Sequence, residues 1–147
     1  MHRTVSIALK IPDNTAFTAL TALRRLGVAV ERVDRSEIWE LEDSGDSATL
    51  AQRVAANATI FNPNKHRLEV RERPAPEDGE AWISEAGDHD EIREHLGGTG
   101  IAGVTRALRS VGWRLYGAGN APVDRSTLAR AVDELLRNPA IEKVRYQ

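Results

Sequence analysis

Two stretches of this chain repeat nearly the same residues, and this constrains the fold more than any other feature. The segment Thr21–Gly27 (TALRRLG) returns as Arg106–Gly112 (RALRSVG). The segment Leu50–Val54 (LAQRV) returns as Leu128–Val132 (LARAV). Self-similarity over such distances indicates that one small supersecondary unit is present twice, so we look for the fold in a half-chain.

The spacing between the copies predicts how the two halves differ. The offset is 85 residues for the first segment and 78 for the second, and an Asn-Pro step returns after 76 residues, at Asn62 and Asn138. The fall from 85 to 78 predicts that the second half lacks seven residues between its two helices. We therefore expect two halves with one plan and a shortened connection in the second.

Composition indicates a globular protein and excludes several function classes. A chain of 147 residues, 41% of them hydrophobic, suits one ordinary domain or two small ones. It has no cysteine, which excludes disulfides, a thiolate nucleophile and cysteine-based metal sites. Residues 1–73 carry 11 basic and 10 acidic side chains and residues 74–147 carry 9 and 12, so no basic face for nucleic acid is expected.

The first hydrophobic run bears on location. Val5–Ile11 is too short to span a membrane and alternates with polar residues, and no signal-peptide pattern accompanies it. We therefore expect a cytoplasmic protein without a membrane partner.

In the first half, hydrophobic periodicity predicts six elements. Residues 4–11 alternate as a half-buried strand, and 12–15 offer a turn with N-cap candidates before a helix that ends at Gly27. Residues 28–33 and 36–42 are expected to be two strands joined by a tight turn at Asp34-Arg35. A helix with Leu50, Val54 and Ala58 and a strand with Leu68 and Val70 complete the ferredoxin-like order βαββαβ.

The second half is expected to repeat this order with a shortened hairpin. Residues 74–79, with two prolines and a glycine, predict a linker, and a short strand begins at Trp82. An inserted polar helix is expected at 88–96, a helix at 104–111, a strand at 113–116, a helix around Leu128 and a closing strand with Val144 and Tyr146. The predicted domains are 1–73 and 80–147, an α+β pair packed as a pseudo-dimer.

Each half resembles the PurS subunit of phosphoribosylformylglycinamidine synthase. The resemblance rests on the helix ending Ala22–Gly27, the segment Val33–Glu42, and Asn62-Pro63 leading into Leu68–Val70; in the second half it rests on Ala107–Gly112 and Asn138–Val144. It covers most of residues 4–72 and roughly 100–146. The family usually has a glycine and a lysine in the hairpin turn, where this chain has Ser36 and Glu37.

The resemblance implies a non-catalytic adaptor that joins a PurQ-like glutaminase to a PurL-like ATP-dependent synthetase in purine biosynthesis. Family members form dimers, so a tandem copy resembles a dimer on one chain, and self-association is a further option. Docking is expected at the hairpin 35–42 and the loop 10–15. The candidate interface residues are Lys10, Pro12, Arg35, Ile38, Glu40 and Glu42. No catalytic, cofactor-binding or metal-binding residue is assigned.

Two alternatives stay open beside the adaptor. Tandem ferredoxin-like units also serve as small-ligand-binding regulatory modules, and a diverged PurS paralogue could have another protein partner. The apolar Ile38 lies on the opposite strand face from Trp39, which suggests that this face is covered, for example by a second sheet. Trp39, Trp82 and Trp113 are expected in the core.

Three motifs have simpler explanations than a site. Gly98–Gly103 spells G-x-G-x-x-G before an expected helix, but no strand precedes it, so we interpret it as a hinge. His89 and His95 are six residues apart and would point to different sides of a helix. The acidic residues around them predict a solvated face. They are Glu77, Asp78, Glu80, Glu85, Asp88, Asp90, Glu91 and Glu94.

Overall fold

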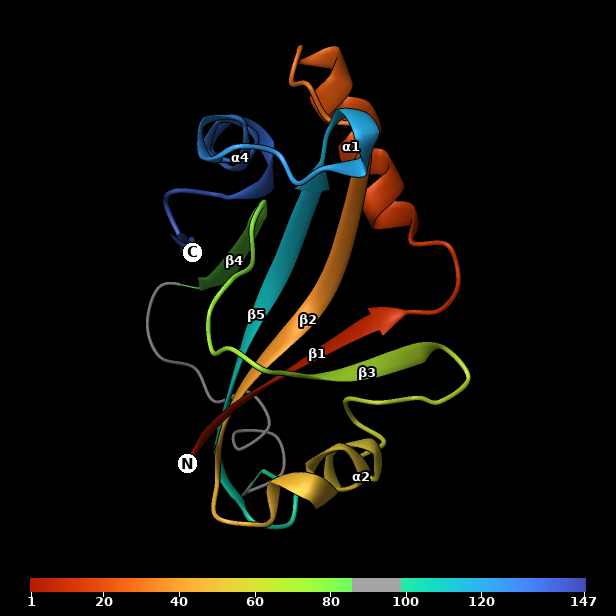
Figure 1. The fold of residues 1–147 in the computed structure, drawn as a ribbon, viewed down its shortest axis with the longest axis vertical. Coiled ribbons are helices and arrows are strands. Elements are labelled where there is room, and N and C mark those ends of the chain that lie inside the picture. Colours follow the sequence, from red (N-terminus) through yellow and green to blue (C-terminus); the bar gives the residue numbers. More distant parts are fainter. Residues whose placement is uncertain (86–98) are drawn as a thin grey trace. The chain divides into compact units, whose positions relative to one another are not determined.

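The structure, a computed structural model, describes residues 1–85 and 99–147, which form an α+β fold (Figure 1). Six strands form one sheet in the order β3-β1-β2-β5-β4-β6, and the ladders β1–β2, β1–β3, β4–β5 and β4–β6 are antiparallel. The elements of the described residues are β1 (His2–Leu9), α1 (Asn14–Arg25), β2 (Arg32–Asp43), α2 (Leu50–Ala55), β3 (His66–Arg71), β4 (Glu80–Glu85), β5 (Val104–Tyr116), α4 (Arg125–Ala131) and β6 (Glu142–Arg145).

The chain forms two compact units, and each takes residues from both sequence halves. Among the described residues, unit 1 contains 1–11, 36–74 and 99–110, and unit 2 contains 12–35, 75–85 and 111–147. The long strands β2 and β5 belong to both units, because β2 changes unit between Arg35 and Ser36. The compact units therefore have different bounds from the predicted domains 1–73 and 80–147.

Unit 1 has its own hydrophobic core on one face of its strands. Val5 and Ile7 alternate along β1, which lies between β2 and β3, and α2 contributes Leu50 and Val54. The Asp46 side chain accepts a hydrogen bond from the Ala48 N–H and begins the 3₁₀ turn that leads into α2. The other buried apolar residues of this core are Trp39, Leu41, Ile60, Ile101, Val104 and Ala107.

Unit 2 has a second core beneath two helices. Asp13 caps α1 by accepting from the Ala16 N–H, as the N-cap prediction expected, and Asp124 caps α4 by accepting from the Thr127 N–H. α4 continues into a π-helical turn, Val132–Leu136. The buried core residues are Ala16, Ala19, Leu23, Val28, Val30, Val33, Ala81, Ile83, Trp113, Leu115, Leu128, Ala131 and Val132.

The strand registers of the two sequence halves match, with β1, β2 and β3 in the first half and β4, β5 and β6 in the second. In the first half, Val5 lies opposite Trp39 and Ile7 lies opposite Leu68. In the second half, Ala81 lies opposite Trp113 and Ile83 lies opposite Val144. The equivalent residues are 76 positions apart in the first and third strands and 74 positions apart in the second strand.

The two Asn-Pro turns also match in their hydrogen bonds. The Asn62 side chain accepts from the Asn64 N–H at 2.9 Å, and the Asn138 side chain accepts from the Ala140 N–H at 3.1 Å. Each asparagine N–H donates to a side chain four residues later, His66 in one turn and Glu142 in the other. Both turns lead into the last strand of their half, so the 76-residue offset relates two turns with corresponding hydrogen bonds.

The predicted hairpin at residues 28–42 is wrong. No turn occurs at Asp34-Arg35, and β2 is one continuous strand from Arg32 to Asp43. The structure describes no counterpart of this hairpin in the second half either, since β5 runs unbroken from Val104 to Tyr116. The seven-residue difference is therefore not a lost hairpin.

The predicted helix at residues 104–111 is also wrong, because this segment is the first part of β5. Val111 alternates with Trp113 and Leu115 toward the core of unit 2, and the strand period overrides the helix spacing. The strands at 66–71 and 142–145, the strand near Trp82 and the helices at Leu50 and Leu128 are confirmed. The helix predicted at 88–96 lies outside the described residues.

Candidate functional site

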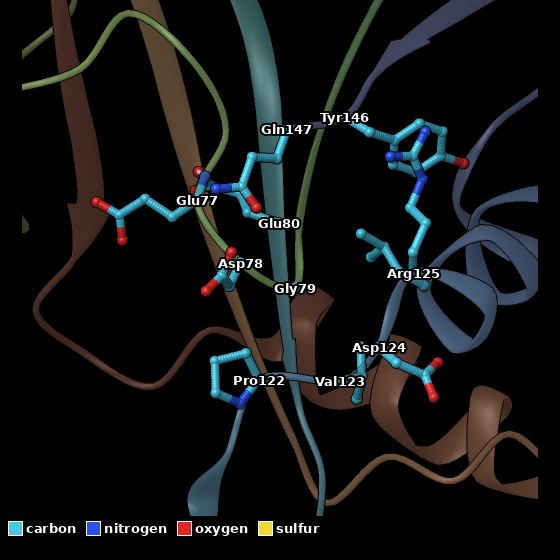
Figure 2. A pocket seen from close by; sticks show the side chains of 11 residues that line it. Glu77, Asp78, Gly79, Glu80, Pro122, Val123, Asp124, Arg125, Tyr146 and Gln147 are labelled. Atoms are coloured by element: carbon cyan, nitrogen blue, oxygen red, sulfur yellow. Dashed lines mark hydrogen bonds between the residues drawn. The ribbon is translucent and has the colours of Figure 1, made fainter.

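Unit 2 contains a pocket of about 360 Å³ between the loop before β4 and the loop before α4 (Figure 2). Its position depends on Gly79, whose carbonyl accepts from the Leu115 N–H at 2.9 Å. Gly79 has a φ of +73°, and a Cβ there would lie 2.8 Å from the Leu115 carbonyl oxygen, so a side chain does not fit. The pocket is lined by Glu77, Asp78, Gly79, Glu80, Pro122, Val123, Asp124, Arg125, Leu128, Tyr146 and Gln147.

One wall of the pocket is a stacked pair. The Arg125 guanidinium lies 3.9 Å from the centroid of the Tyr146 ring, and Figure 2 shows the two groups face to face. Burial, reinforced by the charge of Asp133, raises the pKa of the Tyr146 hydroxyl. This hydroxyl is therefore a neutral hydrogen-bond donor at physiological pH.

The acidic side chains of the pocket are mostly engaged within unit 2. Arg114 donates to the Glu77 carboxylate at 2.7 Å, and the Glu80 carboxylate accepts from the Glu77 N–H at 3.0 Å. The capping bonds from Thr127, together with that from Ser126, lower the pKa of Asp124. The Asp124 carboxylate points away from Glu77 and Asp78 in Figure 2. The acids therefore stabilise the loops that form the pocket.

The pocket has the size and the mixed lining of a small-ligand site. Its volume lies in the range of small-ligand sites, and its walls combine an aromatic ring, a guanidinium and apolar side chains. The described lining residues include no histidine, serine, cysteine or lysine. No local sequence pattern indicates this pocket, because Gly79, Arg125 and Tyr146 are far apart in the sequence.

Three predicted interface residues share one face of β2 in unit 1. Ile38, Glu40 and Glu42 alternate along the strand, on the face opposite Trp39. Ile38 is completely buried, which agrees with the prediction that this face is covered, and it offers no surface to a partner in this structure. Lys10 is exposed, follows β1 and donates from Nζ to the Pro63 carbonyl at 2.8 Å.

The remaining two predicted residues, Pro12 and Arg35, lie in unit 2. Arg35 donates from Nε and Nη2 to the Asp13 carboxylate, at 3.0 and 3.3 Å, and lies over the Trp113 ring. Partial burial acts to raise the pKa of Asp13, but the bonds from Arg35 and Ala16 lower it overall. The structure thus brings Arg35 to the loop that contains Pro12. The expected docking at a hairpin edge is wrong in its geometry, because β2 lies between β1 and β5 inside the sheet.

Sequence reasoning did not identify the strongest polar contact of unit 1. Arg53 on α2 donates to both carboxylate oxygens of Asp43, at 2.8 and 2.9 Å, and the Asp43 side chain is completely buried. It also donates to the carbonyls of Ala102 and Asp46 and to the Thr49 hydroxyl. These five bonds match the five N–H donors of a guanidinium.

The electrostatics of this pair indicate a structural role. The bonds from Arg53 lower the pKa of Asp43, although burial opposes them. All the donors of Arg53 are used inside unit 1, so the pair fixes the loop after β2 and leaves none for a ligand. No periodic pattern in the sequence connects residues 43 and 53, which is why the pair was not predicted.

The glycine string does not precede a helix. Gly100 and Gly103 have φ values of +67° and +80°, and β5 begins at Val104 directly after them. The Gly103 carbonyl accepts from the Ser44 N–H at 2.8 Å, so the turn serves a contact between loops of unit 1. Gly98 lies outside the described residues, and an anion site at a helix start is not formed by the glycines that are described.

The acidic face and the two histidines have different outcomes. Glu80 is 2% exposed, so the prediction of a wholly solvated acidic set is wrong for this residue. His89 and His95 lie outside the described residues. Within 1–85 and 99–147, no three histidine, aspartate or glutamate side chains gather as metal ligands.

The remaining observations concern membranes and known proteins. None of the helices described here is both long enough and apolar enough to cross a membrane. A scan against protein-family models and a search of curated proteins find no match to this chain.

Proposed function

We propose that this chain is a non-catalytic adaptor similar to PurS, with two ferredoxin-like units on one polypeptide that bridge a PurQ-like glutaminase and a PurL-like synthetase. The supporting observation is the correspondence between the two halves in strand register and in one turn. The equivalent strands have the same registers, and both Asn-Pro turns have the same hydrogen bonds. A chain with two copies of one plan is what a family of dimeric subunits would give after tandem duplication.

The proposed mechanism needs surface and orientation, with no catalytic residue in this chain. An adaptor that holds two enzymes together lets ammonia pass from one site to the other before it escapes to water, which is a proximity effect. The exposed candidates for docking are Lys10 and Pro12 beside β1 and Glu42 at the end of β2.

Co-purification tests this proposal. The tagged full chain is mixed with PurL-like and PurQ-like proteins in the presence of glutamine, and a ternary complex is expected. The charge reversals Lys10→Glu and Glu42→Lys, combined, should reduce recovery of the partners, whereas Arg24→Glu on the exposed side of α1 should not. Failure of the wild-type chain to bind either enzyme would contradict the proposal. The alternative of a diverged PurS paralogue with another protein partner would then be favoured.

A second candidate function is a small-ligand-binding regulatory module, and the pocket of unit 2 favours it. A thermal-shift screen with nucleotides and amino acids tests it, because a ligand at 100 times its Kd stabilises the folded chain by about 2.7 kcal/mol. Arg125→Ala should abolish the shift by removing the wall over Tyr146, and Arg24→Ala should preserve it. A ligand whose shift is unchanged by Arg125→Ala would bind elsewhere.

A further inference from the structure

We propose that the edge strand β3 pairs antiparallel with β3 of a second copy of this chain, so that the protein self-associates through this edge of unit 1. The inference is independent of the adaptor function. It rests on the hydrogen-bonding direction of β3, the exposure of its side chains and the order of its charges.

Among the described strands, β3 is the last at its end of the sheet and pairs with β1 alone. The Lys10 N–H donates to the Lys65 carbonyl at 2.7 Å, in line with the β1–β3 register. Hydrogen-bonded and non-hydrogen-bonded pairs alternate in an antiparallel ladder. The backbone groups of Arg67 and Glu69 therefore face β1, and those of Leu68 and Val70 face outward.

The other ladder of β1 supports the same assignment. The Asp43 N–H donates to the Met1 carbonyl at 2.9 Å, so the odd-numbered residues of β1 bond to β2 and the even-numbered ones bond to β3. Thr4, Ser6 and Ala8 are the β1 partners of the odd-numbered residues of β3. Two independent hydrogen bonds thus define which side of β3 is unpaired.

The outward groups are available for a new strand. No hydrogen bond from another described segment reaches the backbone of Leu68 or Val70. Val70 is 38% exposed, although it lies on the same strand face as the buried Val5 opposite it. A row of unpaired N–H and C=O groups is a template for another strand.

The charges on β3 favour a second copy of this chain as the partner and one register of pairing with it. If Leu68 faces Leu68 of a second copy, Arg67 falls opposite Glu69 of that copy, and symmetry repeats the pair. Arg67 is exposed. The Glu69 side chain lies 3.9 Å from the Arg71 Nε of its own strand but is 71% exposed, so both Arg67 and Glu69 can reach across. Opposite charges directly across two strands stabilise their pairing.

The hydrogen bonds fit this register as well. The Leu68 N–H would donate to the Leu68 carbonyl of the second copy, and the Val70 N–H would donate to the His66 carbonyl, each twice by symmetry. The His66 N–H already donates to the Asn62 carbonyl at 2.8 Å and is not needed. A register centred on Glu69 would instead place two glutamates face to face, which is unfavourable.

The chosen register also has two unfavourable pairs, because Lys65 of each copy would face Arg71 of the other at the margins. Arg71 is held inward, where its Nε donates to the Ser6 hydroxyl at 3.2 Å and its side chain is 11% exposed. The two central Arg–Glu pairs therefore decide the register. Since the same surface is used by both copies, the association closes as a dimer and does not continue into a fibre.

Sedimentation velocity of the full chain over a concentration series, at low and high salt, tests the proposal. We expect a reversible dimer that high salt weakens. Arg67→Glu should raise the dimer Kd about tenfold or more, because it places two like-charged pairs across the interface. The double variant Arg67→Glu with Glu69→Arg exchanges the two charges and should restore dimerisation.

Two further variants keep the test decisive. Val70→Pro removes an outward N–H without touching the β1 ladder and should weaken the dimer with unchanged circular dichroism. Arg73→Glu makes the same charge change just beyond β3 and should leave the dimer intact. A chain that stays monomeric up to millimolar concentration would overturn the proposal. A dimer whose Kd is unchanged by both Arg67→Glu and Val70→Pro would also overturn the proposal. An open-ended polymer would overturn it too.

Discussion

Unit 1 and unit 2 share their strand registers and differ in how a helix is anchored to the sheet. In unit 1, Arg53 on α2 binds the buried Asp43 at the end of β2. The residue 78 positions later, at the equivalent place on α4, is Ala131, which is completely buried in the core of unit 2. Both units thus share their strand registers, while the ion pair between Arg53 and Asp43 occurs in unit 1 and has no equivalent at Ala131 in unit 2.

The difference has an energetic meaning. A buried ion pair must offset the desolvation of two charges, so it stabilises little in net terms but is costly to break. A buried alanine carries no such requirement. Unit 1 should therefore lose more stability than unit 2 when this helix anchor is substituted or when Asp43 is protonated.

The largest expected effect tests the shared part of the comparison. Leu41 and Leu115 occupy equivalent places in β2 and β5, and both are completely buried. Leu41→Ala and Leu115→Ala should each lower the free energy of unfolding by about 3 kcal/mol, through lost burial and a residual cavity. Urea denaturation measures this, with the 44% exposed Leu26 as a control in Leu26→Ala.

Hydrogen exchange sharpens the same pair of variants. Leu41→Ala should accelerate amide exchange around Val54 in unit 1, and Leu115→Ala should accelerate it around Leu128 in unit 2. Equal acceleration in both units from either variant would show that the two cores do not open separately.

The next effect concerns the anchor of unit 1. Asp43→Asn leaves Arg53 partly buried without its counter-charge and should cost about 2 kcal/mol of unfolding free energy. Asp124→Asn, at the exposed cap of α4, should cost clearly less. The two melting curves at neutral pH provide the comparison, and equal losses would contradict the special role of the buried pair.

The pH dependence follows from the same group. The pKa of Asp43 is lowered in the folded chain relative to its ordinary value of 3.8, so its stabilising contribution is complete above that value and is lost as pH falls through the folded pKa. Asp13 and Asp124 act in the same direction. Below about pH 4 the wild-type free energy of unfolding should decrease, and Asp43→Asn should flatten part of that decrease. Denaturation between neutral and acid pH measures it; identical slopes for the two proteins would refute the assignment.

The smallest expected effect tests the turns. Asn62→Ala and Asn138→Ala each remove a side-chain acceptor from the same turn and should each cost about 1 kcal/mol. Differential scanning calorimetry should show similar losses for both. A loss of stability in only one of the two variants would mean that the corresponding hydrogen bonds contribute differently to the free energy of unfolding in the two turns.

Much of the local structure could be predicted from the sequence. Asp13 as a cap, the helix that begins at Leu50 and the strand through Leu68 follow from signals within a few residues of each other. The Asn-Pro offset identified two corresponding turns for the same reason, because the hydrogen bonds that they share lie within residues 62–66 and 138–142.

The errors concern segments whose partners are distant in sequence. Arg106–Gly112 resembles the helix at Thr21–Gly27, yet it is a strand, since Gly112 and Trp113 pair with β4. A signal was present: Trp39-Glu-Leu41 returns as Trp113-Arg-Leu115 at the 74-residue offset. It aligns β2 with β5 and contradicts the 85-residue offset of the first segment.

The pocket and the interface residues were predicted less well. The pocket depends on the approach of Gly79 to the Leu115 carbonyl, and no local pattern reports it. Ile38 was correctly expected on a covered face, while its place beside a hairpin turn was wrong because Arg35 continues the strand.

By itself, the sequence determined the α+β class, the cap at Asp13, the period of most elements and the likeness between the last helix, turn and strand of the two halves. Only the tertiary structure decided that β2 and β5 continue through both compact units. The physical reason is that a short polar pair such as Asp34-Arg35 can turn or extend at similar local cost, and the cross-strand hydrogen bonds and core contacts of the neighbouring strands select the extended form.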